Sequence, residues 1–63
     1  MKTKLGEYRN LLGKTQEEMA AQWGISHSFY KMIECGVRNP SIQSMKSFKK
    51  AFPSASIEQI FLD

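Results

Sequence analysis

The sequence predicts an all-α protein that folds as one domain over residues 1–63, with five short helices. Two observations lead to this fold class. Apolar residues recur three, four or seven positions apart, and no stretch alternates apolar with polar residues as a half-buried strand would. Glycines, prolines and helix-capping residues also cut the chain into pieces, each the length of a short helix.

The first two helices are expected over residues 3–12 and 15–24. Gly13 follows the first, as the end of a helix prefers. The second begins with a capping box, in which the Thr15 hydroxyl caps the free backbone N–H groups and the Glu18 side chain reaches back to the cap. The expected apolar faces consist of Leu5, Tyr8 and Leu12 in the first helix and of Met19, Ala20 and Trp23 in the second.

The third helix is expected from Ser26, a favourable N-cap, to Cys35, with Gly36 stopping it. Ser26 comes only two residues after Gly24, which ends the second helix. A link this short cannot reverse the chain, so the two helices must cross steeply. That is the geometry of a helix-turn-helix.

The last two helices are predicted on either side of Pro53, which breaks a helix. Ser41 caps the fourth helix after Pro40, and Ser56 caps the fifth, with Gln59 as its capping-box partner. The residues expected to share a face are Ile42, Met45, Phe48 and Phe52 in the fourth helix and Ile57, Ile60 and Phe61 in the fifth.

On a helical wheel, at about 100° per residue, the third helix has an inward and an outward side. The inward side consists of Phe29, Tyr30, Ile33 and Val37. The outward side consists of Ser28, Lys31, Met32 and Cys35, with His27 and Glu34 at its borders. It carries no carboxylate that DNA phosphates would repel, and an exposed thioether suits an interface. We therefore expect a DNA major groove to be read by His27, Ser28, Lys31 and Met32, with a merely polar surface as the alternative.

Three more residues are candidates for phosphate contacts. Gln16 stands at the N-terminus of the second helix, where free N–H groups and the helix dipole favour an anion. A simple preference of glutamine for helix starts is the alternative. Arg38 follows the third helix and could clamp a phosphate or be an ordinary loop cation, and Lys14 is a weaker candidate of the same kind.

The composition narrows the classes of function. A net charge of +3 and a pI near 9.3 suit a polyanionic partner without requiring one. Cys35 is the only cysteine and His27 the only histidine, so neither a disulfide nor a zinc site is expected, and Cys35 is expected to be a small side chain at a helix end.

The sequence has no paired-carboxylate site, phosphate loop or Ser/His/Asp arrangement, so we expect no enzyme activity, cofactor or small-molecule substrate. Without an apolar run long enough for a bilayer or a secretory signal, a cytoplasmic protein without membrane contact is expected.

Several motifs together resemble the Xre family, the Cro/CI-type helix-turn-helix regulators of phages and bacteria. The matching segments are residues 15–20 (TQEEMA), 23–26 (WGIS), 33–34 (IE), Gly36, 38–41 (RNPS) and 56–61 (SIEQIF). The resemblance implies a five-helix, lambda-repressor-like domain whose second and third helices form the helix-turn-helix, and its docking geometry is that of lambdoid repressors and Cro.

The resemblance also implies roles for individual residues. It places Gln16, the Gly36 end of the third helix and the loop through Arg38 against the DNA backbone, and it pairs Arg9 with Glu34 in a salt bridge under the motif. Ser26 is a further expected phosphate contact. His27, Ser28 and Met32 fall where the family contacts bases. This chain departs from the family pattern at Tyr30, where an aliphatic residue is usual, so that the core is bulkier there or the hydroxyl reaches the surface. It also departs from the pattern at Lys14, His27, Ser28 and Cys35.

The function expected from these features is that of a DNA-binding transcription regulator, repressor-like, acting on a double-stranded operator. Relatives of this kind lengthen their site by binding as dimers to two half-sites. A homodimer on DNA is therefore expected, and Ile57, Phe61 and Leu62 are candidates either for the partner surface or for closing the core. The alternative function is a protein-interaction module of the same fold, an antitoxin or an adaptor.

Overall fold

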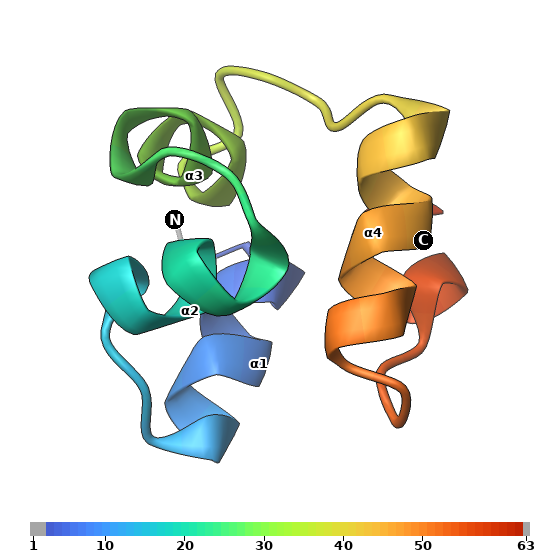
Figure 1. The fold of residues 1–63 in the computed structure, drawn as a ribbon, viewed down its shortest axis with the longest axis horizontal. Helices are drawn as coiled ribbons and strands as arrows, with labels where there is room; N and C mark the ends of the chain where they lie inside the picture. The colour runs from blue at the N-terminus through green and yellow to red at the C-terminus, as the bar shows by residue number, and fades with distance from the viewer. Residues whose placement is uncertain (1–2, 63) are drawn as a thin grey trace.

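Residues 3–62 are described by the structure, a computed structural model, and they contain helices and connecting segments but no strand. Residues 1–2 and 63, the ends of the predicted domain, lie outside this described part. The elements in chain order are α1 (Lys4–Leu12), α2 (Gln16–Trp23), α3 (His27–Glu34), α4 (Ile42–Ala51) and η1 (Glu58–Leu62), a short π-helical turn (Figure 1). The predicted all-α class is confirmed.

The helix starts follow the predicted capping signals. The hydroxyl groups of Thr3, Thr15, Ser26 and Ser41 each accept a backbone N–H hydrogen bond from the third residue of the helix that follows. At α2 the capping box is complete, because the Thr15 N–H also donates to Glu18 Oε1 at 2.8 Å. This backbone hydrogen bond lowers the pKa of the Glu18 carboxyl. Gly13 and Gly24 end α1 and α2 with left-handed φ angles of 68° and 88°.

All four α-helices contribute to the core, η1 packs against it, and aromatic rings fill much of it. The Phe48 ring is central: its centroid lies 4.8 Å from that of Trp23, 4.7 Å from that of Phe52 and 5.1 Å from that of Phe61. The Trp23 Nε1–H donates to the Ser44 carbonyl at 2.9 Å, which fixes α2 against α4. The buried apolar residues are Leu5, Met19, Ala20, Trp23, Tyr30, Ile33, Phe48, Phe52 and Ala55.

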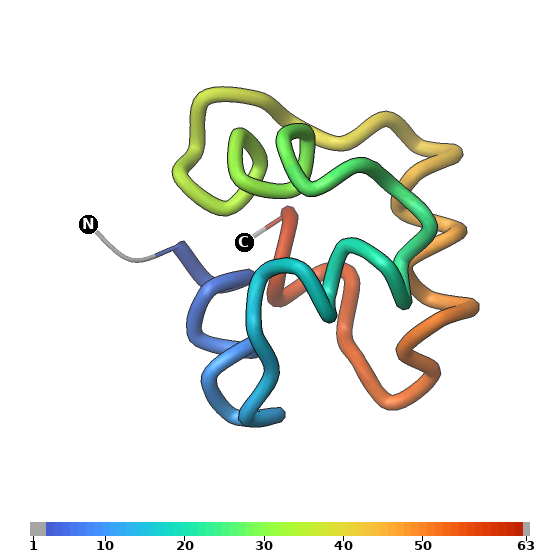
Figure 2. The backbone as a smooth tube through the Cα atoms, turned by 60° about the vertical axis from the view of Figure 1, so that its left-hand side comes forward, coloured from blue at the N-terminus to red at the C-terminus, as the bar shows by residue number. Residues whose placement is uncertain are grey.

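The helices are arranged so that one side of α3 stays uncovered. Figure 1 shows α3 almost end-on while α2 runs across the view, so these two helices cross steeply, as the short link between them predicts. After α4 the chain turns back and places η1 beside α1, which closes the core from below α3 (Figure 2). No helix of residues 3–62 combines the length and the apolarity that a membrane crossing needs.

Three apolar positions differ from the prediction. Val37 was expected on the inward side of α3, but its side chain is 70% exposed. The helix ends at Glu34 and Gly36 adopts a φ of 86°, so the helical wheel no longer applies at Val37. Leu12 and Ile42 share a face with core residues, yet both are exposed, because each occupies the terminal residue of its helix, where neighbouring elements no longer cover it.

Candidate DNA-binding surface

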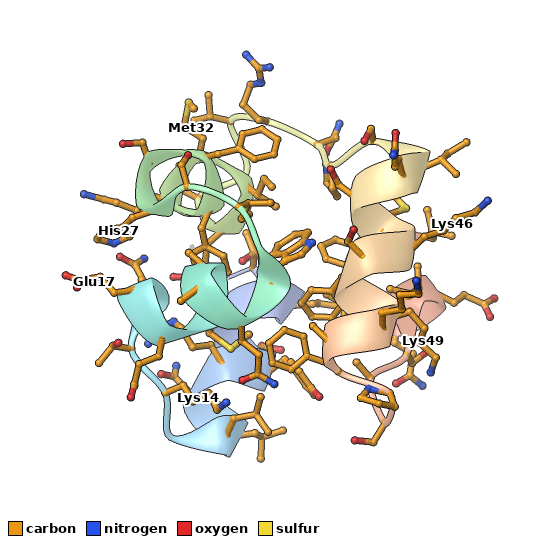
Figure 3. All side chains as sticks on the ribbon, in the orientation of Figure 1. Lys14, Glu17, His27, Met32, Lys46 and Lys49 are labelled. Carbon is orange, nitrogen blue, oxygen red and sulfur yellow. The ribbon has the colours of Figure 1, made fainter. Side chains whose placement is uncertain are left out.

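The outward side of α3 is an open polar surface. His27, Ser28 and Lys31 are exposed, and the Ser26 hydroxyl just before them caps the helix by accepting the Phe29 N–H at 3.1 Å. Met32 is half-buried, so less of its thioether is available than expected. Figure 3 shows His27 and Met32 projecting from α3 away from α4, at the edge of the molecule.

The link after α3 is tied back to the helix. The Met32 carbonyl accepts the N–H groups of Val37 and Arg38 at 3.0 and 3.2 Å, which hold the loop close to the end of α3. The Arg38 guanidinium lies over the Phe29 ring, 5.9 Å from its centroid, within the range of a cation–π contact. Arg38 is exposed, so its charge remains open to an anion on the same side as α3.

The inward side of α3 is held by a hydrogen-bonded carboxylate. Glu34 Oε1 accepts the Tyr30 hydroxyl at 2.7 Å and Arg9 Nε at 2.8 Å. Glu34 Oε2 accepts Gln16 Nε2 at 2.8 Å and Arg9 Nη2 at 3.4 Å. Arg9 Nη1 also donates to the Lys14 carbonyl at 2.9 Å. This group of side chains, which we call the Glu34 network (Arg9, Gln16, Tyr30 and Glu34), connects α1, α2 and α3.

Burial and hydrogen bonding set the charge states in the Glu34 network. Burial by itself raises the pKa of the Glu34 carboxyl, but the hydrogen bonds from Arg9, Tyr30 and Gln16 outweigh it, and the net pKa lies below the ordinary value. The hydrogen bond to Glu34 raises the pKa of Arg9. Burial, and then the hydrogen bond to Glu34, raise the pKa of Tyr30. At neutral pH the network is therefore a carboxylate, a guanidinium and a neutral phenol.

The phosphate candidates fall into two groups. Gln16 is the first residue of α2, and its amide keeps one N–H after donating the other to Glu34. Ser26 and Arg38 flank α3 at its two ends. The Lys14 ammonium instead donates to Gln22 Oε1 and lies 5.8 Å from the Phe52 ring centroid. In Figure 3 it lies at the opposite end of the molecule from Met32 of α3, so the structure does not bring the Lys14 ammonium to the outward side of α3.

Sequence reasoning missed two features of this surface. Tyr30 and Glu34 stand four residues apart on one helix, a spacing that allows side chains to meet, but the hydroxyl was expected either in the core or at the surface. The Tyr30 side chain is buried and its hydroxyl turns to the carboxylate. Glu17 of α2 projects on the same side as His27 in Figure 3, so α2 adds the negative charge that α3 lacks there.

Comparisons with known proteins identify the family. The helix-turn-helix family model (HTH_3) matches residues 5–58. An uncharacterized HTH-type transcriptional regulator of Methanocaldococcus jannaschii is 39% identical over 98% of this chain and 92% of its own length. Similar regulators of Archaeoglobus fulgidus and Methanothermobacter thermautotrophicus are each 34% identical over 98% of this chain, covering 87% and 90% of their own lengths. No solved structure shows a significant match. The chain belongs to the Xre, Cro/CI-type family of helix-turn-helix transcriptional regulators.

Proposed function

We propose that this protein is a repressor-like regulator that inserts α3 into the major groove of a specific double-stranded DNA site. One observation carries the proposal: His27, Ser28 and Lys31 are exposed along α3, and none of their side chains has a hydrogen-bond partner among residues 3–62. Polar groups that the fold leaves unpaired are available to base edges. A protein bound in this way blocks other proteins from the same stretch of DNA, which favours repression as its mode of action.

The side chains of α3 suit a groove that offers several kinds of base edge. The Ser28 hydroxyl both donates and accepts, and Lys31 donates to the O6 and N7 acceptors of guanine. His27 lies in the first turn, which in this docking geometry enters the groove most deeply. The accessible part of the Met32 thioether suits the methyl group of thymine.

Phosphate contacts would fix the orientation of α3 in the groove. The start of α2 supplies free backbone N–H groups and the remaining amide N–H of Gln16. Ser26 and Arg38, at the two ends of α3, extend the contact along the DNA backbone. Lys14 would contribute through its positive charge rather than by direct contact, because its ammonium lies beside Gln22 and Phe52.

Selection from a random duplex library, followed by sequencing, tests DNA binding and defines the site. With that site in hand, Ser28→Ala and Met32→Ala should change which bases are preferred, each by about 1–3 kcal/mol at one position. Gln16→Ala should weaken binding to every duplex alike, because a phosphate carries no sequence information. Ser47→Ala, on the exposed side of α4, is the matched control and should change nothing.

Two outcomes would contradict the proposal. Equal, sequence-independent losses of DNA affinity from Ser28→Ala, Met32→Ala and Gln16→Ala would show that α3 does not read bases in the groove. A complete lack of binding to DNA fragments at low salt would favour the protein-interaction module, because a basic DNA-binding protein shows at least non-specific affinity under those conditions.

We also propose that two copies bind side by side on DNA, through an apolar groove between α4 and η1. Ile57 and Phe61 pack against the core, but Leu62 is 65% exposed and lies beside Ile42, which is 75% exposed. Met45 lines the same groove, and Lys46 stands at its rim. The groove is small compared with the roughly 800 Å² that each partner contributes to a stable interface, so pairing would depend on the DNA.

Half-site and two-half-site duplexes test this pairing. Ile42→Glu should weaken binding to the two-half-site duplex while leaving binding to the half-site unchanged. Leu11→Glu is the matched control, because Leu11 is also exposed but lies on α1. An equal effect of both variants on the longer duplex would argue against the groove between α4 and η1.

A further inference from the structure

We propose that Tyr30 is a positioning residue for DNA binding: its buried hydroxyl fixes the Glu34 carboxylate, which holds the amide of Gln16 toward the DNA backbone. This inference rests on the proposed function, because it takes Gln16 as a phosphate contact. Tyr30 itself would touch no DNA, since its side chain is fully buried. Its influence would pass through the hydrogen bonds of the Glu34 network.

The first support is that the Glu34 carboxylate has no acceptor site left. An ionised carboxylate has about four lone-pair positions, two on each oxygen. Tyr30 and Arg9 Nε occupy Oε1, at 2.7 and 2.8 Å, while Gln16 and Arg9 Nη2 occupy Oε2. A carboxylate held in this way cannot rotate without losing a hydrogen bond, so the position of Oε2 and of the Gln16 amide is fixed.

The second support is that Tyr30 acts from the side that water does not reach. An open cavity of about 240 Å³ borders the network; Arg9, Gln16, Glu34 and Cys35 are among its lining residues, whereas Tyr30 is not. Water in this cavity competes for the carboxylate oxygens. Without the tyrosine hydroxyl, Oε1 has a free lone pair, and turning toward water becomes possible. The Gln16 amide would then lose its fixed partner.

The third support is the contrast between the two hydrogen bonds that Arg9 donates to Glu34. Its Nη2 lies 3.4 Å from Oε2, a long contact, whereas Gln16 Nε2 lies 2.8 Å from the same oxygen. Arg9 therefore anchors Oε1 firmly and Oε2 weakly. Because the two oxygens turn together, the position of Oε2 depends on a second firm hydrogen bond at Oε1. The Tyr30 hydroxyl donates this second hydrogen bond at 2.7 Å.

Tyr30→Phe tests the inference because it keeps the ring and removes only the hydroxyl. Affinity would be measured for the selected site and for an unrelated duplex, at a temperature well below the melting point of each variant. We expect a loss of about three- to tenfold, the size of one hydrogen bond, and the same loss on both duplexes. On a Gln16→Ala background, Tyr30→Phe should cause no further loss.

The matched control is Tyr8→Phe. The Tyr8 ring also packs in the core, with its centroid 6.1 Å from that of Phe48, but its hydroxyl is not part of the Glu34 network. Its removal should leave DNA affinity unchanged. A loss from Tyr30→Phe that persists in full on the Gln16→Ala background would overturn the inference, as would a loss confined to the selected site, or no loss.

A second measurement separates this inference from the proposed function. The side-chain amide signals of Gln16 in ¹⁵N–¹H spectra of the free protein should shift and broaden in Tyr30→Phe and stay unchanged in Tyr8→Phe. Unchanged signals in Tyr30→Phe would overturn the inference whatever the DNA result. Failure of the wild-type protein to bind any duplex would instead overturn the proposed function, while the Gln16 signals would still report the link to Tyr30.

Discussion

The helices α3 and α4 pack on the same α1–α2 pair, but different forces hold them. Charged and polar hydrogen bonds to Glu34 hold the inner side of α3, in addition to its buried Tyr30 and Ile33. The inner side of α4 is held by edge-to-face and tilted ring contacts around Phe48 and by one hydrogen bond from Trp23. Hydrogen bonds fix direction, whereas ring packing supplies buried area with less control over rotation. Under the proposed function, α3 is the helix that needs a defined orientation, and it is the one with the polar network.

The largest effect is expected from a variant that removes the aromatic support of α4. Phe48→Ala should lower the free energy of unfolding by about 3–5 kcal/mol, because the fully buried ring leaves a cavity. A domain this small has only about that much stability, so the variant should be largely unfolded at 25 °C. Urea titration followed by circular dichroism would measure this, with Ile42→Ala on the exposed end of the same helix as the control. A folded Phe48→Ala protein would show that the aromatic cluster is dispensable.

A smaller effect is expected when the polar support of α3 is broken. Arg9→Met should lower the free energy of unfolding by about 2 kcal/mol, because it leaves the Glu34 carboxylate with only its neutral donors, Tyr30 and Gln16. The cost should stay below that of a fully buried pair, since the side chains of Arg9 and Glu34 are 21% and 12% exposed. The double variant Arg9→Met with Glu34→Leu should recover part of the loss in urea unfolding. A double variant no more stable than Arg9→Met would mean that packing, not charge, dominates there.

The same network predicts how stability depends on pH. The pKa of Glu34 is lower in the folded protein than its ordinary value of 4.5, so the folded state favours the ionised form. Its stabilising contribution is complete above the unfolded pKa and is lost as the pH falls through the folded pKa. Melting temperatures should therefore be steady near neutral pH and fall below about pH 4.5. Glu34→Gln should flatten this fall, leaving the part due to Glu18, whose pKa is also lowered.

The smallest expected effect concerns the contact of α1 with the network. A Cβ atom at Gly6 would lie 3.5 Å from two Glu34 side-chain carbons, which is ordinary van der Waals contact. Gly6→Ala should therefore raise the free energy of unfolding by up to about 0.5 kcal/mol, since glycine weakens a helix. Gly24→Ala, where φ is 88°, should instead be destabilising. Thermal melts of the two variants would check the opposite signs.

The sequence predicted the features that depend on neighbouring residues. The caps at Thr15 and Ser26, the helix ends at Gly13 and Gly24, and the buried side of α2 all follow from local spacing, and the structure confirms them. The position of the candidate reading helix follows from the short link before Ser26.

Other features depend on elements that are distant in the sequence. The exposure of Ile42 depends on how far α4 extends past its neighbours, and the direction of Lys14 depends on a contact with Phe52. The hydrogen bond from Gln16 to Glu34 joins residues 18 positions apart, which helical periodicity cannot predict. The roles of individual side chains in DNA contact stay predictions.

The division of α3 into two sides also affects how such a protein can evolve. Among residues 3–62, His27, Ser28 and Lys31 have no hydrogen-bond partners, while Tyr30 and Glu34 on the same helix hold it in place. Under the proposed function, stability and target choice reside in different residues of one helix. Replacements at the three exposed positions should leave the melting temperature nearly unchanged, so a lineage, or a designed library, can move between DNA targets without passing through unfolded intermediates.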